Sequence, residues 1–95
     1  MAAYVDELWL RNGRRWAHLM ADTTGELHAM ARAIGLPSRA YHHLPSGAHY
    51  DLDAPLRDRA IELGAIALTR RDDRARLHQV IATARAQGRA PRGPA

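Results

Sequence analysis

Apolar residues recur at helical spacing in three stretches of the chain. In residues 24–34 they fall at i, i+3, i+4 and i+7, and residues 54–63 and 74–86 show a similar stripe. The stripes consist of Leu27, Met30, Ala31 and Ile34, then Leu56, Ala60 and Leu63, then Leu77, Val80, Ile81 and Ala84. This pattern predicts three amphipathic helices.

Capping residues mark the ends of these helices. Thr23 and Glu26 have the spacing of a capping box, while Asp53 and Asp73 precede the second and third stripes. Pro55 suits the first turn of the second helix. A glycine follows each stripe, namely Gly35, Gly64 and Gly88.

Short apolar runs between the helices predict strands. They lie at residues 3–5, 17–21 and 65–68, with a weaker candidate at 39–43 and a stretch at 48–52 that is extended locally. Strands that alternate with helices of this length predict βαβ units. We therefore expect an α/β domain with a mainly parallel sheet, in three layers, or in two if one sheet face stays open.

The 95 residues allow a single domain, which we place at residues 1–87. Residues 88–95 contain Gly, Pro and Arg without large apolar side chains, and predict a flexible basic tail. Residues 37–53 contain three His, two Pro and one Gly, which is typical of a loop or lid.

Two residue types are missing, and their absence excludes whole classes of chemistry. Without Cys there are no disulfides, thiolate zinc sites or cysteine nucleophiles. Without Lys there is no Schiff-base chemistry. No apolar run is long enough to span a membrane and no secretion signal opens the chain, so we expect no membrane association and a cytoplasmic location.

The positive charge has two interpretations. Fourteen Arg against ten acidic residues give a net charge of +4. Arginine forks bind phosphate, which favours a nucleic acid or nucleotide partner. Arg codons are also GC-rich, so the genome alone can account for the composition. Aromatic residues make up only 5% of the chain, and they supply base stacking poorly.

Aspartates follow the predicted strands. Asp6, Asp22 and Asp51 each come after an apolar run, and Asp72 and Asp73 follow the last one. In a parallel sheet these positions share one edge, where converging carboxylates require a cation, and oxygen ligands favour Mg²⁺ or Mn²⁺. The alternative is that each Asp caps a helix.

Histidines offer a second type of metal site. A composite site of His18, His28 and His49 with an Asp would suit Zn²⁺. Adjacent His42 and His43 point to opposite faces if they lie in a strand, so they would not bind one metal together. The candidate metal ligands are Asp6, Asp22, His18, His49 and Asp51.

Several short motifs give the chain a family resemblance. They are Tyr4-Val-Asp6, His18-Leu19 with Ala21-Asp-Thr23, Glu26-Leu-His28, His49-Tyr-Asp51 and Gly64-Ala65. With these motifs the chain resembles an uncharacterised family of small bacterial and phage proteins, a domain of unknown function. The resemblance implies a shared fold and brings no established activity, cofactor or partner.

A second resemblance concerns the order of elements. The chain resembles a PIN-like ribonuclease core in two features. They are an Asp after the strand ending at Ala21 and the run Leu68-Thr-Arg-Arg-Asp72. This resemblance implies that Asp22 and Asp72, with Asp73 as a competitor, bind Mg²⁺ or Mn²⁺ for attack on a phosphodiester.

Three hypotheses for the function follow. The first is a divalent-metal-binding hydrolase for nucleic acid or a nucleotide phosphate, with Asp22, Asp72, Asp73 and His28 as catalytic residues and Arg70 and Arg71 on the phosphate. The second is a non-catalytic Arg-rich module that binds nucleic acid or a protein. The third is an interaction subunit or homodimer, docked through Trp9 and Trp16 around the polar turn at residues 11–15.

Overall fold

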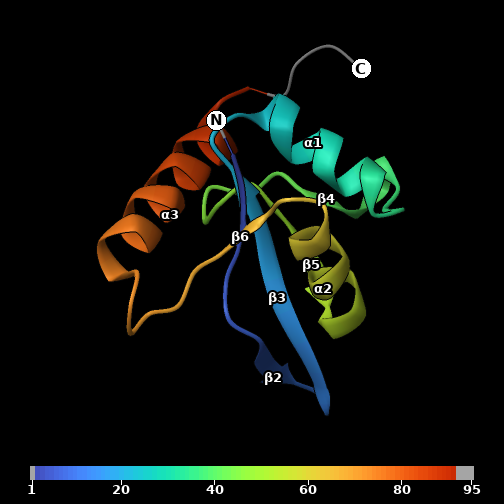
Figure 1. Ribbon diagram of the computed structural model, residues 1–95. Helices are drawn as coiled ribbons and strands as arrows, with labels where there is room; N and C mark the ends of the chain where they lie inside the picture. The colour runs from blue at the N-terminus through green and yellow to red at the C-terminus, as the bar shows by residue number, and fades with distance from the viewer. Residues whose placement is uncertain (1, 92–95) are drawn as a thin grey trace.

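The structure, a computed structural model, describes residues 2–91, in which three strands precede the first helix (Figure 1). The order of the elements is β1 (Ala3–Val5), β2 (Trp9–Arg11), β3 (Arg14–Ala21), α1 (Thr24–Ala33), a 3₁₀ turn (Ser38–Ala40), β4 (Tyr41–His42), β5 (His49–Asp53), α2 (Ala54–Glu62), β6 (Ile66–Ala67) and α3 (Arg74–Arg89).

The sheet is mixed, with strand order β4-β5-β3-β1-β6 and β2 paired to β3. The pair β1–β6 is parallel, and the pairs β1–β3, β2–β3, β3–β5 and β4–β5 are antiparallel. The expectation of a mainly parallel sheet is therefore wrong. Residues 6–13, which join β1 to β3, are too few for a parallel crossover of a dozen or more residues.

The domain has three layers, and the predicted α/β class with three helices is confirmed (Figure 1). Helices α1 and α2 cover one sheet face, whose core includes Val5, Leu19 and Leu52. Helix α3 packs on the other face through Leu77, Val80 and Ala84. No helix in the described residues is long and apolar enough to cross a membrane.

Local signals place the first two helices. Thr23 Oγ1 accepts a hydrogen bond from the Glu26 amide at 3.1 Å, as the capping box predicts, and Asp53 Oδ1 accepts one from Leu56 at 2.9 Å. The two helices end at Ala33 and Glu62, close to the predicted ends.

Helix α3 begins at Arg74 as predicted, but its capping bond and its C-terminal end differ from the prediction. Asp73 occupies its N-cap position, but the Asp73 carboxylate accepts from the Thr69 amide at 3.0 Å instead of capping the helix. At the other end α3 runs through Gly88 to Arg89, where the sequence predicts the tail. Gly88 is buried against the Leu44 carbonyl, so it serves a close approach rather than a helix stop. Of the predicted flexible tail, residues 92–95 lie outside the described residues.

The segment expected as a loop or lid, residues 37–53, contains two strands, β4 and β5, at the strand candidates predicted for residues 39–43 and 48–52. In β5 buried and partly exposed residues alternate, with Tyr50 and Leu52 facing the α1–α2 core. His49 and Asp51 therefore face the side of the sheet that carries α3.

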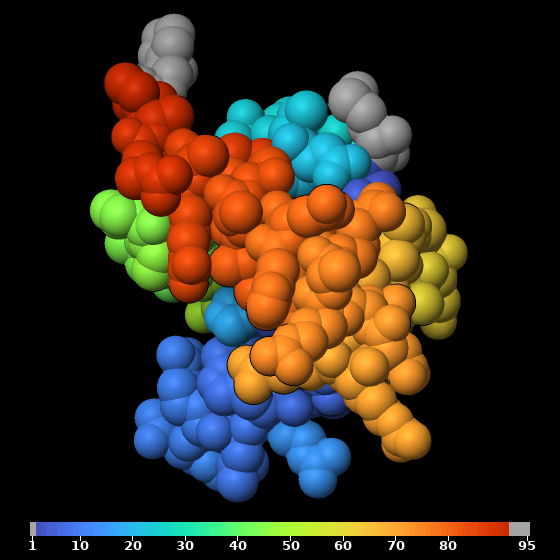
Figure 2. All heavy atoms as spheres, turned by 90° about the vertical axis from the view of Figure 1, so that its left-hand side faces the viewer, coloured from blue at the N-terminus to red at the C-terminus, as the bar shows by residue number. Residues whose placement is uncertain are grey.

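Helix α3 covers only part of its sheet face. Tyr4 and Met20 lie beneath it and are 1% and 5% exposed. Farther along β3 towards the β2–β3 turn, His18 and Trp16 are partly exposed on the same face. Polar side chains gather on this uncovered half, beside the hairpin that projects below α3 in Figure 2.

Candidate metal centre

Strand register brings four ionisable side chains together on the uncovered half of the sheet face. His18 on β3 lies opposite Asp51 on β5, and His42 on β4 lies opposite His49 on β5. Directly opposed residues share a face, as do residues two apart on one strand. His18, His42, His49 and Asp51 therefore form one cluster, called here the His–Asp cluster.

The atoms of this cluster are within reach of a single ion. One ligand atom from each of His18, His49 and Asp51 lies within 4.8 Å of the others. His49 Nε2 is 3.2 Å from Asp51 Oδ1, and His42 Nε2 is 3.5 Å from Asp51 Oδ2. The His42 and His49 rings stack with centroids 4.9 Å apart.

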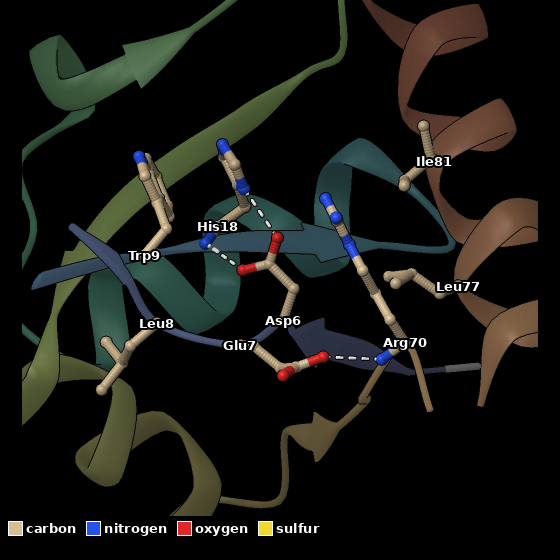
Figure 3. A pocket seen from close by; sticks show the side chains of 8 residues that line it. All are labelled: Asp6, Glu7, Leu8, Trp9, His18, Arg70, Leu77 and Ile81. Carbon is tan, nitrogen blue, oxygen red and sulfur yellow. Dashed lines mark hydrogen bonds and ion pairs between the residues drawn. The ribbon is translucent and has the colours of Figure 1, made fainter. Parts of the chain in front are cut away.

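Asp6 fixes the orientation of His18. Its two carboxylate oxygens accept hydrogen bonds from the His18 amide at 2.6 Å and from Nδ1 at 2.7 Å (Figure 3). The ring of Trp9 stacks on the imidazole at 4.3 Å. Because Nδ1 donates to a carboxylate, the neutral ring keeps its lone pair on Nε2, the arrangement found in metal-binding histidines.

His49 is held in the same tautomer and faces an acceptor. Its Nδ1 lies 2.7 Å from the Gly47 carbonyl, which only accepts, so Nδ1 carries the hydrogen. In the neutral ring, Nε2 then points a lone pair at the Asp51 carboxylate. Two facing acceptors repel, and a cation between them removes the repulsion.

The two histidines have pKa values shifted in opposite directions. Burial lowers the pKa of His18, but the hydrogen bond and charge of Asp6, with the charge of Asp51, outweigh it and raise the pKa above 6.5. For His49, burial lowers the pKa below 6.5 and outweighs the Gly47 hydrogen bond and the Asp51 charge. His49 is therefore neutral at pH 7, which leaves Nε2 unprotonated.

These directions set opposite pH dependences of stability. The folded protein holds the His18 proton more tightly than the unfolded chain does, so the stabilisation is complete below pH 6.5 and is lost as the pH rises through the folded pKa. The His49 contribution is present above pH 6.5 and is lost as the pH falls through its lower folded pKa.

An NMR titration of imidazole resonances in the presence of a chelator checks these directions. We expect the His18 midpoint to lie above 6.5 and the His49 midpoint below it. A His18 midpoint at or below that of His49 contradicts the conclusion that Asp6 and Asp51 together outweigh burial at His18.

A pocket of about 440 Å³ adjoins His18. Its walls combine acidic, aromatic, basic and apolar side chains, namely Asp6, Glu7, Leu8, Trp9, His18, Arg70, Leu77 and Ile81. The Arg70 amide donates to Glu7 Oε1 at 2.6 Å, and its side chain extends into the pocket towards His18 (Figure 3). A positive group thus lies beside the His–Asp cluster.

Two predicted site residues lie away from this cluster. Asp22 follows β3 at the opposite end from the hairpin, where its carboxylate accepts from the Tyr4 hydroxyl at 3.0 and 3.2 Å and from the Ala2 amide at 2.8 Å. His28 lies on α1, beyond the other sheet face, with Nδ1 2.7 Å from the Tyr50 hydroxyl. The antiparallel pairing of β1 with β3 separates Asp22 from Asp6.

The turn before α3 holds the remaining candidates. Asp73 binds the Thr69 amide through its carboxylate, and the Asp72 amide donates to Thr69 Oγ1 at 3.1 Å. Arg71 is exposed and does not line the pocket beside His18. Within residues 2–91, neither Asp72 nor Asp73 joins Asp22 in a group that could hold a metal, so the PIN-like resemblance finds no support.

One member of the cluster, His42, and two of its neighbours, Trp9 and Arg11, are absent from the ligands that the sequence predicts. His42 approaches Asp51, Trp9 stacks on His18, and Arg11 Nη2 lies 4.0 Å from Asp51 Oδ2. The signal that could have placed Trp9 and Arg11 is Asn12-Gly13, a strong hairpin signal that pairs β2 with β3. His43, as expected, does not join His42: its ring contacts Tyr41 and the Ala90 carbonyl.

The fold and the site define a small three-layer α/β domain with a His–Asp cluster on its sheet. Residues 3–80 match the family described as "Protein of unknown function (DUF4031)", and the chain belongs to this family. The predicted resemblance to a domain of unknown function is thereby confirmed. No curated protein and no solved structure matches the chain.

Proposed function

We propose that this protein is a metal-dependent hydrolase of phosphate esters, with Zn²⁺ held by His18, His49 and Asp51. The observation that carries the proposal is the geometry of His49: its Nδ1 lies 2.7 Å from the Gly47 carbonyl, which leaves Nε2 facing Asp51 Oδ1 at 3.2 Å. A cation with nitrogen and oxygen ligands relieves this contact, and His18 supplies the third donor atom.

The donor set favours Zn²⁺ over Mg²⁺ or Mn²⁺. Imidazole nitrogen suits zinc, whereas Mg²⁺ prefers six oxygen ligands and retains several waters. Two histidines and one carboxylate are also the protein ligands of many catalytic zinc sites, which keep a fourth position for water. Asp6 supports His18 as such sites require, because it fixes the ring through Nδ1.

Phosphate ester hydrolysis is the chemistry that the surroundings favour. A Zn²⁺ held by His18, His49 and Asp51 would lower the pKa of a bound water to about 7 and so supply a nucleophile at neutral pH. Water oxygen forms a bond to phosphorus, the ester P–O bond breaks, and the leaving oxygen takes a proton from solvent. Arg70, in the pocket beside His18, balances the negative charge of the phosphate.

Calorimetric titration with Zn²⁺, Mn²⁺ and Mg²⁺ tests the metal centre. We expect one Zn²⁺ per chain, bound more tightly than the other two ions, and loss of this binding in His49→Gln. His78→Gln is the matched control, because His78 is exposed on α3 outside the cluster. Equal zinc binding by the wild-type protein and His49→Gln would show that the ion lies elsewhere.

Hydrolysis of bis(p-nitrophenyl) phosphate tests the activity. We expect zinc-dependent release of p-nitrophenol by the wild-type protein and His78→Gln, and none by His49→Gln. If the protein binds zinc but releases neither p-nitrophenol from this substrate nor phosphate from a nucleotide, the proposed hydrolase activity is contradicted. The proposed metal site then still stands.

A further inference from the structure

The β2–β3 hairpin is an exposed cationic arm next to the His–Asp cluster. Residues 8–16 contain Arg11, Arg14 and Arg15 and no acidic residue. Asn12 and Gly13 have φ of 52° and 77°, which closes a tight two-residue turn whose twist matches the strands. In Figures 1 and 2 the arm projects beyond the helices. All residues from Leu10 to Arg15 are exposed.

One face of this arm continues the face of the cluster. Trp9 lies opposite Trp16, and Arg11 lies opposite Arg14. Because side chains two apart on β3 share a face, Arg14, Trp16 and His18 follow one another on the same side. The contacts agree with this order: Trp9 stacks on His18 at 4.3 Å, and the Arg11 guanidinium lies 5.6 Å from the Trp16 ring centre.

The arginines of this face are available to a partner. The Arg11 side chain is 55% exposed and reaches Asp51 only at 4.0 Å. Within the described part of the chain, Arg14 takes part in none of the ion pairs found. Arginine side chains and the two tryptophan rings therefore line one face from the tip of the arm to the His–Asp cluster.

We propose that this face binds single-stranded nucleic acid and leads its phosphodiester backbone to the His–Asp cluster. The inference rests on the proposed function for its catalytic part and deepens it by naming the substrate class. Aromatic residues are few in the chain, but both of its tryptophans, Trp9 and Trp16, lie on this face. Arginines with aromatic rings between them are the physical basis of single-strand binding, because phosphates pair with the cations and unpaired bases stack on the rings.

The extent of the surface favours a strand over a single nucleotide. Arg14 and His18 are four residues apart on β3, a separation of roughly 13 Å at 3.3 Å per residue. Beyond His18, on the side away from Trp9, Arg70 provides a further cation (Figure 3). Positive charge on both sides of the cluster matches a chain of phosphates that passes over it.

Fluorescence anisotropy with short labelled oligonucleotides tests this surface. The probes are oligothymidylate, oligouridylate of the same length, a duplex and adenosine monophosphate as competitor, each with zinc and with a chelator. The variant is Arg11→Gln/Arg14→Gln. Its matched control, Arg85→Gln/Arg89→Gln, removes the same charge from exposed positions on α3.

We expect both single strands to bind better than the duplex, with and without zinc, and their relative affinity identifies DNA or RNA as the preferred strand. In a plot of log affinity against log salt, each phosphate contact to a single strand contributes a slope of about 0.7. Loss of two contacts should therefore reduce the slope by about 1.4 in the hairpin variant. The control variant should keep the wild-type slope.

Three results overturn the proposal: equal slopes in the two double variants, preference for the duplex, or complete competition by the mononucleotide at equal concentration. The two proposals fail separately. Hairpin-dependent strand binding without zinc binding refutes the hydrolase and supports the non-catalytic Arg-rich module. Zinc binding without strand binding refutes the strand surface alone.

Discussion

Replacement of Asp6 by asparagine is expected to weaken zinc binding about 10- to 100-fold while the domain stays folded. The reason is the tautomer of His18. Asp6 accepts from the His18 amide with one oxygen and from Nδ1 with the other. An asparagine has a single oxygen, which the backbone N–H requires. Its NH₂ group then faces Nδ1, so Nδ1 must accept and the imidazole proton moves to Nε2.

This prediction has a readout that needs no metal. In the presence of a chelator, the ¹⁵N shifts of His18 should report the Nδ1–H form in the wild-type protein and the Nε2–H form in Asp6→Asn. Zinc affinity is then measured by calorimetry. Glu7→Gln is the matched control, because it removes the same charge from the next residue, whose carboxylate accepts from the Arg70 amide and, among residues 2–91, makes no hydrogen bond to His18. An unchanged tautomer in Asp6→Asn contradicts the assigned role of Asp6.

Gly88→Ala is expected to destabilise the protein by roughly 1–3 kcal/mol or more, the range for overpacking of a filled interior. A Cβ at this position collides with the carbonyl oxygen of Leu44, which is backbone and cannot rotate away. Residues 43–48 also carry the Ala48 amide, which donates to the Ala84 carbonyl at 2.8 Å, and they lead directly into His49. The collision therefore pushes on the segment that holds the cluster.

The matched control for Gly88→Ala is Gly25→Ala in α1. A Cβ at Gly25 meets nothing closer than Thr23 Oγ1 at 3.9 Å, so the gain in helix propensity should stabilise the protein by about 0.4–1 kcal/mol. Urea denaturation followed by circular dichroism measures both. If Gly88→Ala is as stable as the wild-type protein, the Leu44 carbonyl does not approach α3 as closely as the structure indicates.

The reason for which the sequence groups some of the candidate ligands is wrong. A parallel sheet predicts that Asp6 and Asp51 lie near one another, and the same argument includes Asp22. In the mixed sheet, Asp22 lies at the far end of β3, while His18 and Asp51 are cross-strand partners. Residue type and position after a strand therefore suggested candidates, but strand direction selected among them.

The sequence by itself determined the features that depend on neighbours in the chain. The apolar stripes and caps such as Thr23 and Asp53 defined the helices, because these interactions join residues three or four apart. Asn12-Gly13 defined a turn for the same reason.

Only the tertiary structure decided which strands pair, in which direction and in which register. The partners His18 and Asp51 are far apart in sequence, and a shift of one residue between β3 and β5 would turn one of them to the α1–α2 core. The intrinsic strand propensity of these residues is the same in either register. The packing of both sheet faces against three helices therefore fixes the register. The His–Asp cluster is a property of that register.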